Sequence, residues 1–197
     1  MRCLLCGKRT GSSSMPLVAM FSDDPLCYDC RKLWKPYTGN RDIEGLHTDI
    51  LYDYRSGYSS ALIQYKECGD EALKDIFLYP HIEKIRWKYR GYTLLLMPSA
   101  KDKLRQRGFD HLKEMFACLN MPMMSPFEKL REIDQKGGGR SRRTVMSGNI
   151  ILKEGTVLPE KILLADDVVT TGSTLRGALK CIDTRKHRIM ILCVGGV

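Results

Sequence analysis

The sequence predicts an α/β protein built on an open parallel sheet flanked by helices, with a small cysteine-rich segment at the N-terminus. Residues 93–97, 162–165 and 189–194 are apolar at successive positions, which is typical of strands buried in the middle of a parallel sheet. Residues 173–184, between the last two strands, carry apolar side chains at helical spacing: Leu175, Ala178, Leu179 and Ile182. Strand, helix and strand then form a βαβ unit, whose crossover should be right-handed.

Along the chain, we expect residues 1–35 to form a knuckle held by a metal, because this stretch is too short and turn-rich for a core of its own. Residues 36–45 are polar and rich in turn formers, which predicts a linker. The main domain then covers residues 46–197, with an N-terminal part at 46–90 and a core at 91–197.

Within the N-terminal part, residues 46–65 fit either a hairpin or a strand followed by the start of a helix. Residues 70–89 look helical, with an interruption near Pro80 because proline removes a backbone donor. In the core, residues 108–119 predict the helix that follows strand 93–97, and two aspartates are expected to stop strand 162–165.

The composition indicates a basic protein without a membrane span. The 197 residues include 32 Lys and Arg against 23 Asp and Glu, a formal net charge of +9. That excess favours anionic partners such as nucleotides, phosphates or nucleic acid, although a basic protein can also lack any polyanion partner. Neither an apolar run of about 18 residues nor a signal peptide is present, so we expect a cytoplasmic location.

Residues 162–174 form the most informative pattern. A buried strand ends in Asp166 and Asp167, and a turn rich in hydroxyl groups then opens a helix. The amides and positive dipole end of a helix N-terminus suit a phosphate dianion, and Gly172 lets the backbone approach it closely. The two carboxylates can accept from vicinal ribose hydroxyls or hold Mg²⁺ indirectly. The hydroxyl donors are Thr170, Thr171, Ser173 and Thr174.

Two other interpretations of this pattern have to be weighed. An apolar strand with two aspartates also occurs in P-loop NTPases, but the chain lacks the G-x-x-x-x-G-K-[ST] loop that they require. The segment could also be a capped helix after a strand, with Ser173 as the N-cap. Because the whole pattern lies between a strand and a helix, we favour the phosphate site.

A second segment suited to anions, residues 98–111, follows the first strand. Over seven positions its four cations face only Asp102: they are Lys101, Lys103, Arg105 and Arg107. This loop leaves the sheet at the same edge as the phosphate turn, so the two suit a ligand with phosphate at both ends. The alternative is a run of charges exposed to solvent.

Four of the eight cysteines stand in two C-x-x-C pairs, Cys3 with Cys6 and Cys27 with Cys30. This spacing predicts a structural, tetrahedral zinc site with all four positions filled by thiolates. Redox disulfides are the less favoured alternative. The remaining cysteines, which we expect to be small core residues, are Cys68, Cys118, Cys181 and Cys193.

Trp34 admits two interpretations of about equal weight. With Tyr28 and Tyr37 it lies near several cations, so it could stack on the bases of a single-stranded nucleic acid. It could instead pack the knuckle against the main domain.

The pattern at residues 162–174 resembles the phosphoribosyl pyrophosphate (PRPP) motif of type I phosphoribosyltransferases. The resemblance implies that Asp166 and Asp167 contact the ribose, that residues 170–174 wrap the 5′-phosphate, and that Mg²⁺ binds with PRPP. The loop after the first strand would then hold pyrophosphate through Ser99, Lys101, Arg105 and Arg107.

Residues 98–111 carry the form P-x-x-x-x-x-L-R-x-R-G-F-x-H, which resembles the ComF family of natural competence proteins. Lys66 with Gly69 and Asp70 also fits that family, and so does a segment with Gln135, Arg143 and Asn149. The resemblance makes residues 46–90 the hood of the fold and residues 128–148 a flexible catalytic loop. From that loop Arg140, Arg142 or Arg143 would close on the leaving group, and Arg143 joins Asp166 and Asp167 as a predicted catalytic residue. The alternative is an exposed basic loop with no catalytic role.

Three functions are compatible with this resemblance. The first is a phosphoribosyltransferase in which a nitrogen nucleophile displaces pyrophosphate from PRPP. The second is a non-catalytic module of DNA uptake that senses PRPP, binds single-stranded DNA and partners an ATP-driven DNA translocase. A transcriptional regulator that responds to PRPP is the third, and the absence of a helix-turn-helix pattern argues against it.

Overall fold

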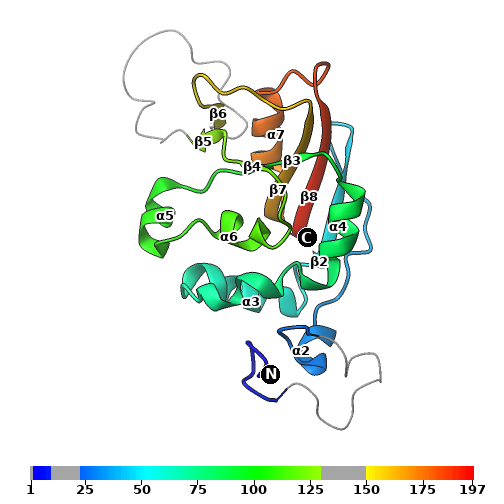
Figure 1. Cartoon of the computed structure of the whole chain (residues 1–197), viewed down its shortest axis with the longest axis vertical. Helices are drawn as coiled ribbons and strands as arrows, with labels where there is room; N and C mark the ends of the chain where they lie inside the picture. The colour runs from blue at the N-terminus through cyan, green and yellow to red at the C-terminus, as the bar shows by residue number, and fades with distance from the viewer. Residues whose placement is uncertain (1, 10–22, 130–149) are drawn as a thin grey trace.

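The computed structural model describes residues 2–9, 23–129 and 150–197. Within these ranges a six-stranded sheet forms the centre of the protein (Figure 1), in the order β1-β2-β8-β7-β3-β4. Its strands are β1 (Asp42–Ile43), β2 (Leu46–Asp53), β3 (Thr93–Leu96), β4 (Met123–Met124), β7 (Lys161–Val169) and β8 (Arg188–Gly196). β1 pairs antiparallel with β2, and the other neighbouring pairs are parallel. The predicted fold class is confirmed.

The central strands β3, β7 and β8 are buried, as their successive apolar residues predict. Leu95, Leu164 and Ile191 are fully buried. A side chain on either face of a parallel strand needs cover from helices, so such a run cannot serve as an edge exposed to water. A separate antiparallel ribbon joins β5 (Phe127–Lys129) to β6 (Ile150–Leu152).

Helices lie on both sides of the sheet, and α3 lies across its carboxyl edge (Figure 1). They are α2 (Tyr28–Lys32), α3 (Gly57–Glu67), α4 (Ile82–Lys88), α5 (Lys101–Arg107), α6 (His111–Ala117) and α7 (Ser173–Lys180), with short 3₁₀ turns at η1 (Glu71–Ile76) and η2 (Tyr79–His81). Of the two arrangements predicted for residues 46–65, the structure has the strand followed by a helix. The predicted break near Pro80 coincides with η2. None of the helices in the described ranges has the length and apolarity needed to cross a bilayer.

The predicted end of strand 162–165 is wrong. β7 continues through Asp166 and Asp167 to Val169, because β8 pairs with it as far as the register Val169↔Gly196. The ladder of hydrogen bonds to β8 holds the chain extended even where the side chains turn acidic. Successive side chains of a strand point to opposite faces, so the two carboxylates do not lie side by side.

The cationic segment after β3 is a helix and not the predicted loop. α5 is built from good helix formers such as Lys, Arg, Gln and Leu. It ends at Gly108, whose φ of 84° provides the left-handed cap that a side chain would strain. A second helix, α6, then begins after its N-cap Asp110. The helix predicted over residues 108–119 is therefore present as α6, but it is the second helix after β3 and not the first.

The cysteine-rich segment packs against the main domain through Trp34. This side chain is only 5% exposed and makes ring contacts with Tyr52, Tyr58 and Phe77. Arg31 of α2 donates to the Ile76 carbonyl oxygen at 2.9 Å and lies over the Trp34 ring. Of the two interpretations of Trp34, packing is therefore confirmed, and its ring is not available to a nucleic acid base.

Candidate functional site

Parallel pairing brings the ends of β3 and β7 to one edge of the sheet. Leu96 is paired with Ala165, so the segment that follows β3 and the aspartates of β7 emerge next to each other. A ligand of an open parallel sheet binds at this carboxyl edge. The structure therefore places Ser99, Asp166 and Asp167 in one region, as the sequence predicts.

Asp167 is the centre of a polar network at this edge. Its side chain is 9% exposed, and its Oδ2 accepts from Lys66 Nζ at 2.5 Å and from His111 Nε2 at 2.7 Å. Burial alone would raise the pKa of Asp167, but the hydrogen bond from His111 and the ammonium of Lys66 outweigh it and lower that pKa below its ordinary value. Asp167 is thus a buried carboxylate held in its ionised form.

The contacts of His111 fix which ring nitrogen carries its proton. Arg107 lies 2.6 Å from His111 Nδ1, and a guanidinium can only donate, so Nδ1 accepts. The proton then resides on Nε2, which donates to Asp167. Ser99 Oγ lies 3.3 Å from the same Nδ1, and its hydroxyl can donate there as well. A chain of contacts therefore joins Ser99 and Arg107 to the carboxylate through one imidazole.

Helix α3 holds this network in place from the other side. Tyr58 donates to the Asp167 carbonyl oxygen at 2.8 Å, and Tyr65 donates to the His111 carbonyl oxygen at 2.9 Å. Both tyrosines are fully buried and point from the same helix as Lys66. Because the network joins α3, α6 and β7, it fixes α3 against the carboxyl edge of the sheet.

Asp166 has a different environment. Its Oδ1 accepts from the Asp167 amide at 2.9 Å, and it makes no ion pair with any described residue. Burial, and then the charge of Asp167, raise the pKa of Asp166 to about 8. Asp166 is therefore protonated at neutral pH, and a group beside it that donates hydrogen bonds or carries positive charge would favour its ionised form.

The turn between β7 and α7 carries the residues predicted to hold a phosphate, and within it the Ser173 amide donates to Thr171 Oγ1 at 3.3 Å. Gly172, at φ 76°, is the N-cap of α7, so the alternative cap Ser173 is instead the first helical residue. Arg176 donates to the Thr171 carbonyl oxygen at 2.6 Å, and Arg41 donates to that of Thr170. In a trans peptide the following N–H points the opposite way, so these amides face away from the two arginines. The side chains of Thr170, Thr171 and Ser173 are exposed, and that of Thr174 is half-buried.

The α5 cations do not act as one group. Lys101 pairs with Glu128 at 3.3 Å and Lys103 with Glu67 at 3.5 Å, whereas Arg105 is exposed. Arg107 turns inward, where it contacts His111 and donates to the Lys66 carbonyl oxygen at 2.8 Å. Three of these cations thus have local partners.

A hollow of about 180 Å³ opens beside Ser99 and Lys101. Lys129 and Lys153 line it as well, together with the acidic residues Asp110 and Glu128. This part of the site therefore offers cations from three segments of the chain. The predicted catalytic Arg143, with the rest of the Gln135 to Asn149 segment, lies outside the described residues.

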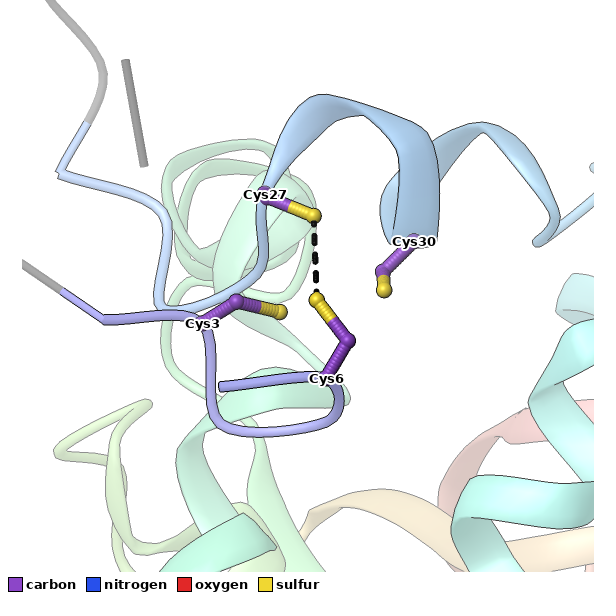
Figure 2. A group of neighbouring side chains, drawn as sticks. All are labelled: Cys3, Cys6, Cys27 and Cys30. Atoms are coloured by element: carbon purple, nitrogen blue, oxygen red, sulfur yellow. Dashed lines mark hydrogen bonds between the residues drawn. The ribbon is translucent and has the colours of Figure 1, made fainter. Parts of the chain in front are cut away.

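The four predicted metal ligands converge. Figure 2 shows Cys3 and Cys6 on one loop and Cys27 and Cys30 at α2, with their sulfur atoms directed toward one another. All four sulfurs lie within 4.8 Å of one another, and those of Cys6 and Cys27 are 3.7 Å apart. A tetrahedral site with bonds of about 2.3 Å places sulfurs about 3.8 Å apart. The group can therefore hold a metal ion.

The pKa values of the Cys3, Cys27 and Cys30 thiols are shifted in different directions. Burial, and then the neighbouring thiols, raise the pKa of Cys30 well above its ordinary value, and burial also raises that of Cys27. At Cys3 burial has the opposite effect to the nearby backbone amides, which prevail and lower its pKa to about 7. Four thiolates this close need a cation to compensate their charge.

Sequence reasoning missed the parts played by Lys66, His111 and Tyr58. Lys66 and His111 stand in the quoted ComF-like patterns, so a signal for them existed, but their meeting at Asp167 did not follow from it. Tyr58 and Arg41 carry no recognisable signal, since one is an ordinary helix residue and the other lies in the predicted linker.

Comparison with known proteins extends the resemblance to nearly the whole chain. The chain is 26% identical to the competence protein ComFC of Streptococcus pneumoniae, over 93% of this chain and 94% of that protein. It is 25% identical to competence protein ComFC of Bacillus subtilis, over 91% of this chain and 88% of that protein. No protein-family model matches. The resemblance to ComF proteins that the motifs indicate is confirmed.

Among solved structures, a hypoxanthine phosphoribosyltransferase from Staphylococcus aureus matches with a TM-score of 0.38 and 12% identity. The match covers 69% of this chain and 62% of that chain, which is less than two thirds of its length.

Proposed function

We propose that this ComF-like chain binds PRPP with Mg²⁺ at the carboxyl edge of its sheet and serves DNA uptake in natural competence. The observation that carries the proposal is the geometry after β7. A buried strand delivers Asp166 and Asp167 to this edge, and the three residues that follow its end at Val169 turn the chain into α7, with exposed hydroxyls at its start.

Each part of PRPP has a candidate partner. The turn at residues 170–174 holds the 5′-phosphate through its amides and hydroxyls. Asp166 accepts from the ribose hydroxyls, while Asp167 keeps Lys66 and His111 in position. The hollow beside Ser99 and Lys101 receives pyrophosphate, with Arg105 at its approach. Mg²⁺ enters with the phosphates, which it prefers as oxygen ligands and whose charge it neutralises.

We further propose that the metal at the four cysteines is zinc and that its role is structural. An all-thiolate set favours zinc and leaves no coordination position for water. The knuckle contacts the hood through Trp34 and Arg31, and the hood supplies Lys66, Tyr58 and Tyr65 to the site. Zinc would thereby stabilise the site from a distance without taking part in chemistry.

A role in binding rather than in transfer is favoured by His111. Both of its ring nitrogens are engaged, so it offers no base to an incoming nucleophile. The proposed role in competence follows the ComFC relatives. Single-stranded DNA and a DNA translocase as partners follow only from the resemblance of the motifs, and neither needs a transfer reaction. Phosphorus NMR of PRPP with each nucleobase tests this: release of pyrophosphate above the spontaneous rate would establish a transferase.

The proposal of PRPP binding is tested by thermal shift and calorimetry with the zinc-loaded full chain. PRPP with Mg²⁺ should raise the melting temperature, because a ligand at 100 times its Kd stabilises by about 2.7 kcal/mol. A Thr171→Ala, Ser173→Ala double variant should bind at least about tenfold more weakly, since two charge-assisted hydrogen bonds are lost.

The matched control is Glu154→Gln, an exposed acid on the turn before β7 that should leave affinity unchanged. Ribose 5-phosphate and pyrophosphate, tested separately, report the two halves of the site. Absence of any shift with millimolar PRPP and Mg²⁺ for the wild type would refute the proposal.

A further inference from the structure

Trp87 on α4 is the most exposed large aromatic side chain in the described part of the protein. It is 83% exposed, whereas Trp34, the other tryptophan, is 5% exposed. An exposed indole offers a large flat face, and covering that face gains free energy. The ring of Trp87 is therefore open to stacking by a partner.

Cationic residues lie on both sides of Trp87 along the chain. Lys84 lies three residues before it on α4, which is the spacing of neighbours on a helix surface, and Arg90 lies in the turn that follows the end of α4 at Lys88. Neither pairs with a carboxylate in the described ranges. By contrast, Arg86 pairs with Glu83 at 3.4 Å and Lys88 with Asp49 at 2.5 Å. The two cations beside the ring are thus available to an anion.

The cationic surface continues from α4 onto the amino edge of the sheet. The ammonium of Lys161 lies close to Gly91, the neighbour of Arg90 in the chain: a side-chain carbon placed on Gly91 would be 4.0 Å from Lys161 Nζ. Lys161 begins β7 and is the register partner of Arg188, which begins β8 and is exposed. We call the surface formed by Lys84, Trp87, Arg90, Lys161 and Arg188 the Trp87 strip.

We propose that the Trp87 strip binds single-stranded DNA, with a base stacked on Trp87 and phosphates on the four cations. Single-strand binding surfaces combine an aromatic face with a groove of positive charge that follows the backbone. A duplex keeps its bases stacked inside, so it can use only the cations. One ring among four cations fits a polyanion with accessible bases better than it fits an apolar protein surface.

This proposal rests on the single-stranded DNA partner of the proposed function, and it locates that partner away from PRPP. The strip lies at the amino ends of β7 and β8, while the PRPP site lies at the carboxyl ends. In Figure 1, α4 also stands on the opposite side of the molecule from α5. Loss of DNA binding and loss of PRPP binding can therefore be measured separately.

Tryptophan fluorescence tests the proposal directly, because the two tryptophans differ so strongly in exposure. Titration of the full chain with an oligothymidylate at low salt should quench the emission of Trp87 and leave that of the buried Trp34. Trp87→Phe should bind with similar affinity but lose the quenching, since phenylalanine still stacks. Trp87→Ala should bind between about fivefold and about 150-fold more weakly.

Salt dependence tests the cations. Four phosphate contacts predict a slope of log K against log salt of about −2.8 for a single strand, and an Arg90→Ala, Lys161→Ala double variant should halve it. Lys113→Ala, which removes an exposed cation from α6, is the matched control and should change the slope little. All variants should keep the PRPP response of the wild type.

Three results would overturn the proposal. They are an oligothymidylate affinity that Trp87→Ala leaves unchanged, equal affinity for a duplex of the same length, or quenching that persists in Trp87→Phe. An absence of quenching at low salt would also overturn it. A failed PRPP response with intact DNA quenching would refute only the proposed PRPP site.

Discussion

Replacing Lys66 with methionine should destabilise the protein at neutral pH, because it leaves Asp167 buried beside a neutral side chain. The side chains of Asp167 and Lys66 are 9% and 23% exposed. Removing one partner of a fully buried ion pair costs about 3–5 kcal/mol. Since His111 still donates to Asp167 and Lys66 is partly exposed, we expect about 2–3 kcal/mol, or roughly 5–10 °C in melting temperature for a chain of this size.

The assay is urea unfolding of the zinc-loaded chain followed by circular dichroism. Lys74→Met is the matched control, because Lys74 pairs with Glu114 at 3.2 Å but both side chains are about a third exposed. That pair should be worth at most about 1 kcal/mol. Asp167→Asn removes the charge that Lys66→Met leaves unpaired. The free energy of unfolding of the Lys66→Met, Asp167→Asn double variant should therefore fall by at least about 1 kcal/mol less than the sum of the falls in the two single variants.

The pH dependence gives a second readout with a definite sign. Asp167 has a lowered native pKa, so its contribution to stability is present above about pH 4 and is lost only as pH falls through that lowered value. Without Lys66 the native pKa rises, and protonation removes the buried charge at a higher pH. The deficit of Lys66→Met should therefore shrink from pH 7 to pH 5. A deficit under about 0.5 kcal/mol at pH 7, or one that is constant with pH, would refute this account.

Three further outcomes are expected. The native pKa of Asp166 is raised to about 8, so between about pH 4 and pH 8 the folded form holds a proton that the unfolded chain releases. Wild-type stability should therefore fall as the pH rises through this window. In Mg²⁺-free urea titrations, Asp166→Asn should gain stability relative to wild type as the pH rises from 5 to 8.5. Elemental analysis should find one zinc per chain, and Cys27→Ser should lose it and melt lower by at least about 5 °C, whereas exposed Cys68→Ser should do neither. Gly172→Ala should lower the free energy of unfolding in urea by about 1–3 kcal/mol, because φ is 76° and the added carbon would lie 3.0 Å from Ile43 Cδ1. At Gly155 φ is 73° but the space is open, so Gly155→Ala is the control. Equal losses in the two variants would show that the contact with Ile43 contributes nothing to the loss at Gly172.

The parallel sheet could be predicted because its evidence is local. Continuous apolar runs at residues 93–97, 162–165 and 189–194 became β3, β7 and β8, and the helical spacing after residue 173 became α7. The paired cysteines predicted their own convergence, since two C-x-x-C units can satisfy one tetrahedral ion. In each case a handful of neighbouring residues carries the pattern.

The errors arose where neighbours in space override local composition. Acidic residues suggested the end of a strand at residue 165, yet pairing with β8 carries β7 to Val169. The charges of residues 101–107 suggested a loop, although their helix propensity and the cap at Gly108 produce α5. Hydrogen bonding and capping decided these boundaries, and composition alone did not express them.

By itself, the sequence determined the α/β class, the cysteine cluster and the turn after β7, because each depends on residues that are close in the chain. Only the tertiary structure decided that Lys66, 101 residues away, pairs with Asp167, to which His111 also donates, and that Trp34 is buried while Trp87 is exposed. Both tryptophans lie among cations in the sequence, and which one water reaches depends on what the fold packs against it. Burial and long-range ion pairs are properties of the assembled core, so no local pattern can specify them.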